Sequence, residues 1–352
     1  MPSRARVAIN GFGRIGRAAL KIGLDRPDIE WVAINDRADG RTLAHLFKYD
    51  SVYGLFPGQV EWVGSALVIN GRSIPVTAER DPLRLPWKER GVDIVLESSG
   101  RLTDAAEAKA HLTSGAERVI ISAVAPKADL TVCMGINEEH FDPARHRILS
   151  NASCTTNAVA PLAHVLNETF GIRHGAMTTI HCMTNGQPVQ DSCLNDLRRA
   201  RSAGASMIPT STNADHAIGV VLPALRGKLK CLSVRVPTPY VSLVDLTVDL
   251  KRSATRDEIN IAFRKAAASK LGEVLGYSDA PLVSRDFLRN PKSSIFDATL
   301  TEVVDGSLTK VIGWYDNEWG YSNRVIDLMG LISRKTRRPS SVGDRLLEAV
   351  LL

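Results

Sequence analysis

The chain has 352 residues, a formal net charge of +6 and 44% hydrophobic against 23% charged residues, a balance typical of a globular protein with room for two domains. No apolar run reaches the ~18 residues of a membrane span and the first strand begins too close to Met1 for a signal peptide, so we expect a cytoplasmic protein that binds no membrane. The five cysteines lack CxxC spacing and the basic residues are mostly scattered, which argues against disulfides, a metal site and a nucleic-acid surface.

The N-terminal segment predicts a dinucleotide-binding unit. Residues 6–9 form a short apolar strand, and a helical run extends to about residue 24. Between them, Gly11, Gly13 and Gly16 fit the GxGxxG pattern. The first glycine makes a tight turn, the second admits a pyrophosphate, and the third lets the helix pack closely on the strand.

A second predicted strand, residues 31–35, ends at Asp36, twenty residues after Gly16. A carboxylate at that distance can bond the adenosine ribose of a bound dinucleotide. Arg37 leaves the choice of cofactor open, because a guanidinium at this point could pair with a 2′-phosphate or could simply be solvated.

The rest of the first half alternates strands with helices. Residues 66–76 read as a hairpin with an Asn-Gly turn, and near-continuous apolar strands follow at 92–97 and 119–122. This alternation predicts a Rossmann-type, doubly wound parallel sheet in a NAD(P)-binding domain over residues 1–152.

Cys154 lies where a strand, ending near residue 149, gives way to an apolar helical run that stops at Gly171. The partial positive charge of a helix N-terminus is expected to lower the pKa of this thiol, and its free N–H groups can hold an oxyanion or a phosphate. The alternative is a small buried hydrophobic residue. His181 follows 27 residues later at the end of a predicted strand and could form a nucleophile–base pair with Cys154.

The second half predicts an α+β catalytic domain over residues 153–316. A polar stretch at 182–206 is long enough to be a functional loop, and residues 244–250 alternate as an antiparallel strand with one wet face. A last helix begins at residue 317 and is expected to complete the N-terminal domain. The tail to residue 352 is either part of that helix or a docking segment for another subunit.

Several stretches resemble phosphorylating glyceraldehyde-3-phosphate dehydrogenases over essentially the whole chain. The most specific are Ala152-Ser153-Cys154-Thr155-Thr156-Asn157 and Trp314-Tyr315-Asp316-Asn317-Glu318-Trp319-Gly320. The resemblance implies a homotetrameric oxidoreductase of glycolysis or gluconeogenesis. Such an enzyme oxidises a phosphorylated aldehyde with NAD or NADP and inorganic phosphate, through a hemithioacetal and a thioester on the cysteine.

The same resemblance implies roles for individual residues. Cys154 would be the nucleophile and His181 its base. Further cofactor contacts would come from Arg14, Ile15, Arg80, Ser122 and Asn317. The substrate phosphate would bind Thr184 and Arg235, and Arg199 would be a further contact with the substrate anion. Inorganic phosphate would bind at Ser153, Thr155 and Thr212, with Asn213 beside them.

Three departures from the family pattern stand out. Ala158 replaces a second cysteine, Asn213 replaces a glycine and puts the phosphate site's geometry in question, and Ser192-Cys193 replaces a Leu-Pro pair of NAD-specific members. The last change and Arg37 favour NADP use, whereas Asp36 opposes it by repelling a 2′-phosphate. Two alternatives remain: an erythrose-4-phosphate dehydrogenase, and a redox-sensing or binding protein without turnover.

Overall fold

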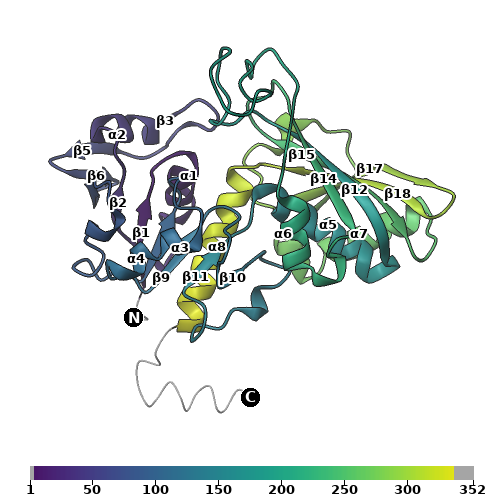
Figure 1. Cartoon of the computed structure of the whole chain (residues 1–352), viewed down its shortest axis with the longest axis horizontal. Coiled ribbons are helices and arrows are strands. Elements are labelled where there is room, and N and C mark those ends of the chain that lie inside the picture. Colours follow the sequence, from purple (N-terminus) through teal and green to yellow (C-terminus); the bar gives the residue numbers. More distant parts are fainter. Residues whose placement is uncertain (1–3, 337–352) are drawn as a thin grey trace.

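The computed structural model describes residues 4–336, which form two sheets with helices around them (Figure 1). The tail beyond residue 336, whose role the sequence left open, lies outside the described residues. Within residues 4–336, no helix combines the length and the apolar character needed to cross a bilayer. In the same part of the chain, no three His, Cys, Asp or Glu side chains gather closely enough to hold a metal ion.

The first sheet has nine strands in the order β10-β11-β9-β8-β1-β2-β7-β6-β5. Its strands are β1 Ala5–Asn10, β2 Ile29–Asn35, β5 Val60–Val63, β6 Ala66–Ile69, β7 Arg72–Thr77, β8 Ile94–Glu97, β9 Arg118–Ile121, β10 Leu130–Thr131 and β11 Ile148–Ser150. All neighbours are parallel except β5–β6 and β6–β7. The predicted doubly wound sheet is therefore confirmed, with an antiparallel hairpin added at one edge.

Helices α1 Arg14–Gly23, α2 Gly40–Lys48, α3 Ala105–Ala108 and α4 Ala110–Thr113 accompany this sheet, and β3 Tyr49–Asp50 pairs with β4 Gly54–Leu55. The last helix, α8 Trp319–Thr336, packs against α1. Its buried residues Val325, Ile326 and Met329 join the same hydrophobic core as β1. Figure 1 shows α8 running between the N-terminal sheet and the second sheet, so the chain's last described element returns to its first.

The second sheet is mixed, with strand order β13-β14-β12-β15-β18-β17-β16. Its strands are β12 Ile172–His181, β13 Ile208–Thr210, β14 Leu229–Arg235, β15 Ser242–Leu250, β16 Leu275–Ser278, β17 Ser294–Val304 and β18 Leu308–Tyr315. Helices α5 Cys154–Phe170, α6 Ala214–Val221 and α7 Arg256–Ala267 belong to the same half. In β15 every second residue is buried, so the predicted alternation is confirmed. The buried residues of α5 share a core with β12, β15 and β18.

Between β12 and β13, residues 182–207 form no helix or strand, as the sequence predicted for a long loop. Three of its apolar side chains are strongly exposed: Val189 (82%), Leu197 (82%) and Met207 (75%). The loop starts directly after His181, so it lies beside the predicted catalytic pair.

Candidate active site

A sharp turn between β11 and α5 places Cys154 at the head of a helix. Ala152 has a φ of 54°, in the left-handed region that non-glycine residues rarely adopt. The backbone carbonyl of Ala152 accepts a hydrogen bond from the Tyr321 hydroxyl of α8 (3.1 Å). Ser153 caps the helix, because its Oγ accepts a hydrogen bond from the N–H of Thr156 (3.0 Å). Cys154 is therefore the first residue of α5, where the sequence placed it.

The end of β12 brings His181 to this cysteine. The Cys154 Sγ lies 3.6 Å from His181 Nε2. The imidazole is buried (3% exposed) and stands edge-on to the Tyr315 ring, with centroids 6.0 Å apart. Tyr315 is held in turn by the hydroxyl groups of Thr155 (3.1 Å) and Thr179 (2.8 Å). The imidazole is therefore fixed within reach of the sulfur.

The protonation states of the pair differ from the sequence-based expectation. Burial raises the pKa of the Cys154 thiol, and the opposing effects of Arg235 and of hydrogen bonds at the start of α5 do not outweigh it. The predicted lowering of this pKa by the helix N-terminus is therefore wrong for this structure. Burial, together with the charge of Arg235, lowers the pKa of His181 to about 3. At neutral pH the pair is a thiol beside a neutral imidazole, which is a form able to accept a proton.

A cavity of about 660 Å³, here called the cysteine pocket, opens in front of this pair. Nine of the residues predicted from the sequence line it, namely Arg14, Ile15, Ser122, Ser153, Cys154, His181, Thr184, Arg235 and Asn317. They come from the start of α1, the end of β9, the head of α5, the loop after β12, the end of β14 and the segment before α8. Residues from both sheets thus converge on one cavity.

Four predicted anion-binding residues do not line the cysteine pocket. The Thr155 side chain is buried against Tyr315. Arg199 pairs with Asp196 (2.9 Å) in the exposed loop. The Thr212 Oγ1 accepts a hydrogen bond from the N–H of Ala214 (3.2 Å), and Asn213 is exposed at the N-cap of α6. The side chains of Thr155, Arg199 and Thr212 thus have hydrogen-bond or ion-pair partners within the protein, outside the cysteine pocket.

Asn317 faces the pocket in a defined orientation. Its Oδ1 accepts hydrogen bonds from Cys182 Sγ (3.0 Å) and from Ser242 Oγ (3.5 Å). The Nδ2 amide group forms no hydrogen bond within residues 4–336, so it can donate to a ligand. Asn317 is only 8% exposed and lines the cysteine pocket. Its Nδ2 amide group is therefore the part of the side chain that can contact a ligand.

The glycine turn opens a second cavity of about 480 Å³, here called the glycine-loop pocket. Gly11 has a φ of +94°, and a Cβ there would lie 2.3 Å from the Ser99 nitrogen. A Cβ on Gly16 would lie 2.4 Å from the Gly11 carbonyl oxygen. A Cβ on Gly13 would meet nothing within 4 Å, and Gly13, as the N-cap of α1, supplies no side-chain cap. The turn therefore offers open space and free N–H groups, the environment that a pyrophosphate requires.

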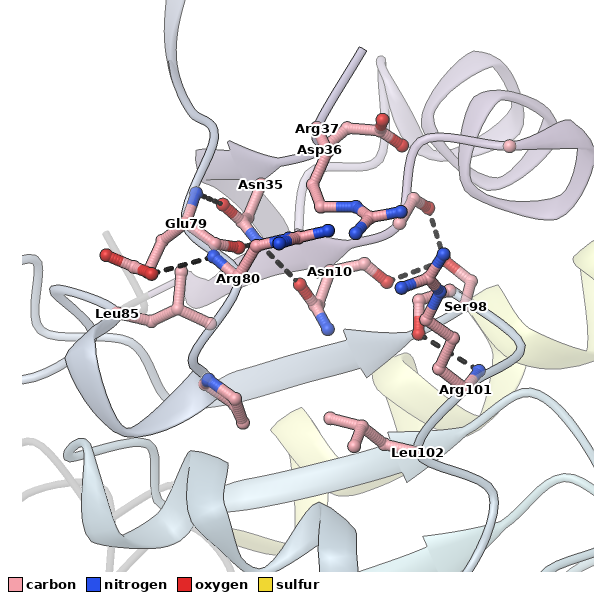
Figure 2. Close-up of a pocket in the computed structure, with 14 residues that line it drawn as sticks. Asn10, Asn35, Asp36, Arg37, Glu79, Arg80, Leu85, Ser98, Arg101 and Leu102 are labelled. Carbon is pink, nitrogen blue, oxygen red and sulfur yellow. Dashed lines mark hydrogen bonds between the residues drawn. The ribbon is translucent and has the colours of Figure 1, made fainter.

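Asp36 lines the glycine-loop pocket and is bonded to the glycine turn itself. Its Oδ2 accepts a hydrogen bond from the Phe12 N–H (2.7 Å), and its Oδ1 accepts one from the Ala38 N–H (2.9 Å). Figure 2 shows Arg37, Arg80 and Arg101 around the same pocket. The arrangement fits a dinucleotide, because a carboxylate is held where a ribose would lie and open space remains at Gly13 for the phosphates.

A buried hydrogen-bond network supports the floor of this pocket. The Trp87 Nε1–H donates to His111 Nδ1 (3.0 Å), so His111 Nε2 carries the proton that meets Glu97 Oε2 (2.9 Å). Asn10 Nδ2 donates to the same oxygen (2.6 Å), and Asn35 Nδ2 donates to Asn10 Oδ1 (2.8 Å). Asn10 and Asn35 line the pocket, so the shape of the pocket depends on the Glu97 side chain that holds Asn10.

Comparison with known proteins assigns both parts of the chain to one family. Residues 5–105 match the family described as glyceraldehyde 3-phosphate dehydrogenase, NAD binding domain, and residues 153–317 match its C-terminal domain. The chain is 53% identical to the glyceraldehyde-3-phosphate dehydrogenase of Geobacillus stearothermophilus over 330 residues, which cover 94% of this chain and 98% of that protein. The chain belongs to the glyceraldehyde-3-phosphate dehydrogenase family. Similar relatives are glyceraldehyde-3-phosphate dehydrogenase 1 of Bacillus subtilis (52% identical; 94% and 98% covered) and the enzyme of Kitasatospora aureofaciens (53%; 94% and 99%).

Two departures from the glyceraldehyde-3-phosphate dehydrogenase pattern are structurally mild. Asn213 has a φ of −91°, so the backbone there does not require glycine. Ala158 is fully buried in the core of α5, where a small side chain fits. Ser192 and Cys193, which replace the Leu-Pro pair, are exposed in the long loop.

Several residues that line these pockets were not predicted from the sequence. Gln187, Glu318 and Tyr321 line the cysteine pocket, and Arg101 lines the glycine-loop pocket. Gln187 is 9% exposed; its Oε1 accepts a hydrogen bond from the Thr184 N–H (3.2 Å), while its buried Nε2 has no partner in the described part of the chain. Gln187 lies only three residues after Thr184 in the sequence, and this proximity could have indicated that it belongs to the same pocket.

Proposed function

We propose that this chain is a phosphorylating glyceraldehyde-3-phosphate dehydrogenase. It oxidises D-glyceraldehyde 3-phosphate, with NAD(P) and inorganic phosphate, to 1,3-bisphosphoglycerate in a reversible reaction. The observation on which the proposal rests is the 3.6 Å approach of Cys154 Sγ to His181 Nε2, in a pocket that Thr184, Arg235 and Asn317 also line. Nothing in either pocket favours the erythrose-4-phosphate or the non-catalytic alternative.

The nucleophilic step follows from the resting protonation states. The Cys154 thiol is protonated and His181 is a neutral base, so the sulfur adds to the aldehyde carbon as its proton passes to His181 Nε2. The N–H groups at the head of α5 and the imidazole then stabilise the oxygen of the hemithioacetal. A bound nicotinamide supplies the hydride acceptor for the oxidation. His181 returns its proton to the aldehyde-derived oxygen to complete the hemithioacetal, and it takes the hydroxyl proton back during the oxidation. Phosphate then attacks the Cys154 thioester, the C–S bond breaks to release the acyl phosphate, and the proton on His181 Nε2 returns to the Cys154 sulfur.

The cofactor would be held by Gly11, Gly13, Gly16 and Asp36 at its adenosine half. Arg14, Ile15, Arg80, Ser122 and Asn317 are the proposed further contacts. The free Nδ2 of Asn317 would donate to the nicotinamide carboxamide, since its Oδ1 is already occupied. These N–H groups would hold the carboxamide at the wall of the cysteine pocket.

NADP use is proposed alongside NAD. Arg37, Arg80 and Arg101 are exposed around the glycine-loop pocket, and Glu79 on its wall pairs instead with Arg84 (3.6 Å). This leaves more positive than negative charge near Asp36, which favours a 2′-phosphate. The measurement is kcat/KM with each cofactor, and an NAD preference above about a hundredfold, ~2.7 kcal/mol, would end this part of the proposal.

The proposed reaction requires two anion-binding sites, one for the phosphate of the substrate and one for inorganic phosphate. Thr184 and Arg235, both on the cysteine pocket, are proposed for the phosphate of the substrate. Ser153, also on its wall, is proposed for inorganic phosphate. The family resemblance alone supports Thr155, Thr212 and Asn213 as further contacts for inorganic phosphate, and Arg199 as a contact with the substrate anion.

We propose a cytoplasmic homotetramer with a NAD(P)-binding domain over residues 1–152, completed by the C-terminal segment 317–352, whose described part contains α8, and a catalytic domain over 153–316. The exposed Val189, Leu197 and Met207 of the long loop support an assembly that covers them. No membrane or nucleic-acid partner is proposed.

The test is reduction of NAD or NADP with each aldehyde, glyceraldehyde 3-phosphate and erythrose 4-phosphate, with and without inorganic phosphate. We expect a phosphate-dependent rate with the first aldehyde. Cys154→Ser is expected to abolish oxidation while the cofactor still binds. A rate independent of phosphate would favour the erythrose-4-phosphate alternative, and activity retained by Cys154→Ser would rule out the covalent mechanism.

A further inference from the structure

The carboxylate of Asp316 is buried and accepts four hydrogen bonds just before α8. Its Oδ1 accepts two bonds from N–H groups at the start of α8 (3.1 and 2.8 Å) and one from the hydroxyl of Tyr53 (2.8 Å). Its Oδ2 accepts a bond from the N–H of Arg289 (2.9 Å). Asp316 is 1% exposed, so these donors stand in for water around the carboxylate. The Tyr53 hydroxyl is the one side-chain donor among them.

Tyr53 comes from the other half of the chain, from the turn between β3 and β4, and is held there on several sides. Its ring packs against Trp319, with centroids 5.0 Å apart. The guanidinium groups of Arg14 and Arg289 lie 5.3 and 5.8 Å from the centre of the same ring. Burial, together with the charge of Asp316, raises the pKa of the Tyr53 hydroxyl, which therefore keeps its proton and remains a donor.

Asn317 lies between two residues that are both bound by the N-terminal half. The residue before it is Asp316, bonded to Tyr53. The residue after it is Glu318, whose Oε2 accepts a hydrogen bond from Arg14 Nε (2.9 Å). The direction in which the Asn317 amide points depends on the backbone that these two contacts hold.

The two contacts differ in how a bound cofactor would affect them. Arg14 lines the cysteine pocket and is itself a proposed cofactor contact, so a ligand there can engage its guanidinium. Tyr53 lines neither pocket, and its side chain is only 6% exposed. The hydrogen bond from Tyr53 to Asp316 can therefore persist when the pocket fills.

We propose that Tyr53 is a positioning residue for the nicotinamide end of the cofactor. Its hydroxyl holds Asp316, and Asp316 sets the place from which the Nδ2 amide group of Asn317 reaches the cysteine pocket. The inference rests on the proposed function, in which Asn317 donates to the carboxamide. It gives a role in cofactor binding to a residue of the β3–β4 turn that touches no ligand.

The experiment compares the Kd values of NAD and ADP-ribose by calorimetric titration. ADP-ribose keeps the adenosine and the pyrophosphate but lacks the nicotinamide ring. Tyr53→Phe removes only the hydroxyl and leaves a ring of the same shape. We expect the Kd for NAD to rise about tenfold, close to the effect of one hydrogen bond to a charged group. The Kd for ADP-ribose should change less than twofold.

Tyr277→Phe is the matched control, because it removes a hydroxyl that accepts a hydrogen bond from Arg264 (3.1 Å) outside both pockets. This variant should bind both ligands as the wild type does. If Tyr53 served only to stabilise α8, Tyr53→Phe would lower the thermal stability and leave the ratio of the two Kd values unchanged. An unchanged ratio would overturn the positioning role.

A double-mutant cycle tests the route through Asn317. Asn317→Ala removes the proposed carboxamide donor, so adding Tyr53→Phe to it should not raise the Kd for NAD any further. Independent, additive losses would overturn this route. An Asn317→Ala variant that binds NAD as the wild type does would overturn the proposed carboxamide contact and the positioning role with it.

Should Tyr53→Phe fail to fold, hydrogen–deuterium exchange of the wild type provides the test. NAD should slow exchange more than ADP-ribose does, both in residues 316–320 and in residues 50–55. Extra protection confined to residues 316–320 would show that the two segments are not coupled and would overturn the inference.

None of these measurements requires turnover, so the failure of this inference differs from the failure of the proposed function. A protein that loses NAD affinity selectively in Tyr53→Phe but does not oxidise glyceraldehyde 3-phosphate would overturn the proposed function. An active enzyme in which Tyr53→Phe changes both Kd values equally would overturn only the role of Tyr53.

Discussion

Replacing Gly11 and Gly13 separately by alanine tests the glycine turn with an internal control. An alanine Cβ at position 11 would lie 2.3 Å from the Ser99 nitrogen and 2.4 Å from its Cα, and the backbone there has a φ of +94°. Backbone strain contributes ~1–3 kcal/mol and overlap with a fixed main chain another ~1–3 kcal/mol. We therefore expect Gly11→Ala to lower the free energy of unfolding by ~2–6 kcal/mol.

Gly13→Ala should behave differently, because a Cβ there meets nothing within 4 Å and the backbone is extended. The variant should unfold like the wild type, yet its Cβ would enter the space proposed for the pyrophosphate, so we expect the Kd for NAD to rise at least tenfold. Thermal unfolding at one protein concentration and calorimetric titration with NAD measure the two effects. A stable Gly11→Ala, or a Gly13→Ala that binds NAD as tightly as the wild type, would refute this account of the turn.

Three more predictions follow from buried groups. Glu97→Gln removes a carboxylate that accepts four hydrogen bonds and should lower the free energy of unfolding by about 3 kcal/mol; the exposed Glu302→Gln is the control, and equal thermal stability of the two variants would contradict the prediction. His181 has its pKa lowered to about 3 by burial, so the unfolded chain takes up a proton below pH ~6.5 that the folded chain refuses. The stability of the wild type relative to His181→Asn should then fall by about 1.4 kcal/mol per pH unit from pH ~6.5 toward 3, and a difference independent of pH in denaturant titrations would exclude the buried neutral imidazole. Cys182→Ala removes a donor to Asn317 Oδ1 and should raise KM for the cofactor several-fold, whereas Cys182→Ser should restore it; equal kinetics of both would show that this contact does not orient the amide.

Much of the fold could be predicted from neighbouring residues. The Gly11 turn, the hairpin at Asn70-Gly71 and the strand-to-helix turn before Cys154 depend on short stretches of chain whose backbone preferences are local. The pattern of apolar residues along each strand, continuous in the doubly wound sheet and alternating in the mixed sheet, can also be seen within a short stretch of sequence. Family motifs added residues far apart in sequence, such as Arg235 and Asn317, which the structure places on one pocket.

The missed residues depend on contacts between distant segments. Glu97 acquires its role from Asn10 and His111, and Arg101 reaches the glycine-loop pocket only because β8 lies beside β1. The spacing of residues in the sequence does not indicate which distant residues will be in contact in the fold. The same holds for Thr155, whose hydroxyl turns to Tyr315, 160 residues later in the chain, instead of toward the cavity.

The sequence by itself determined the two sheets, the position of Cys154 at the head of α5 and the family to which the chain belongs. Tertiary structure alone decided the protonation states of Cys154 and His181, the proposed catalytic pair. The position of Cys154 at a helix N-terminus favours a thiolate, but burial raises the pKa of the Cys154 thiol and lowers the pKa of His181. Desolvation depends on everything packed around a group, so no short stretch of sequence encodes it.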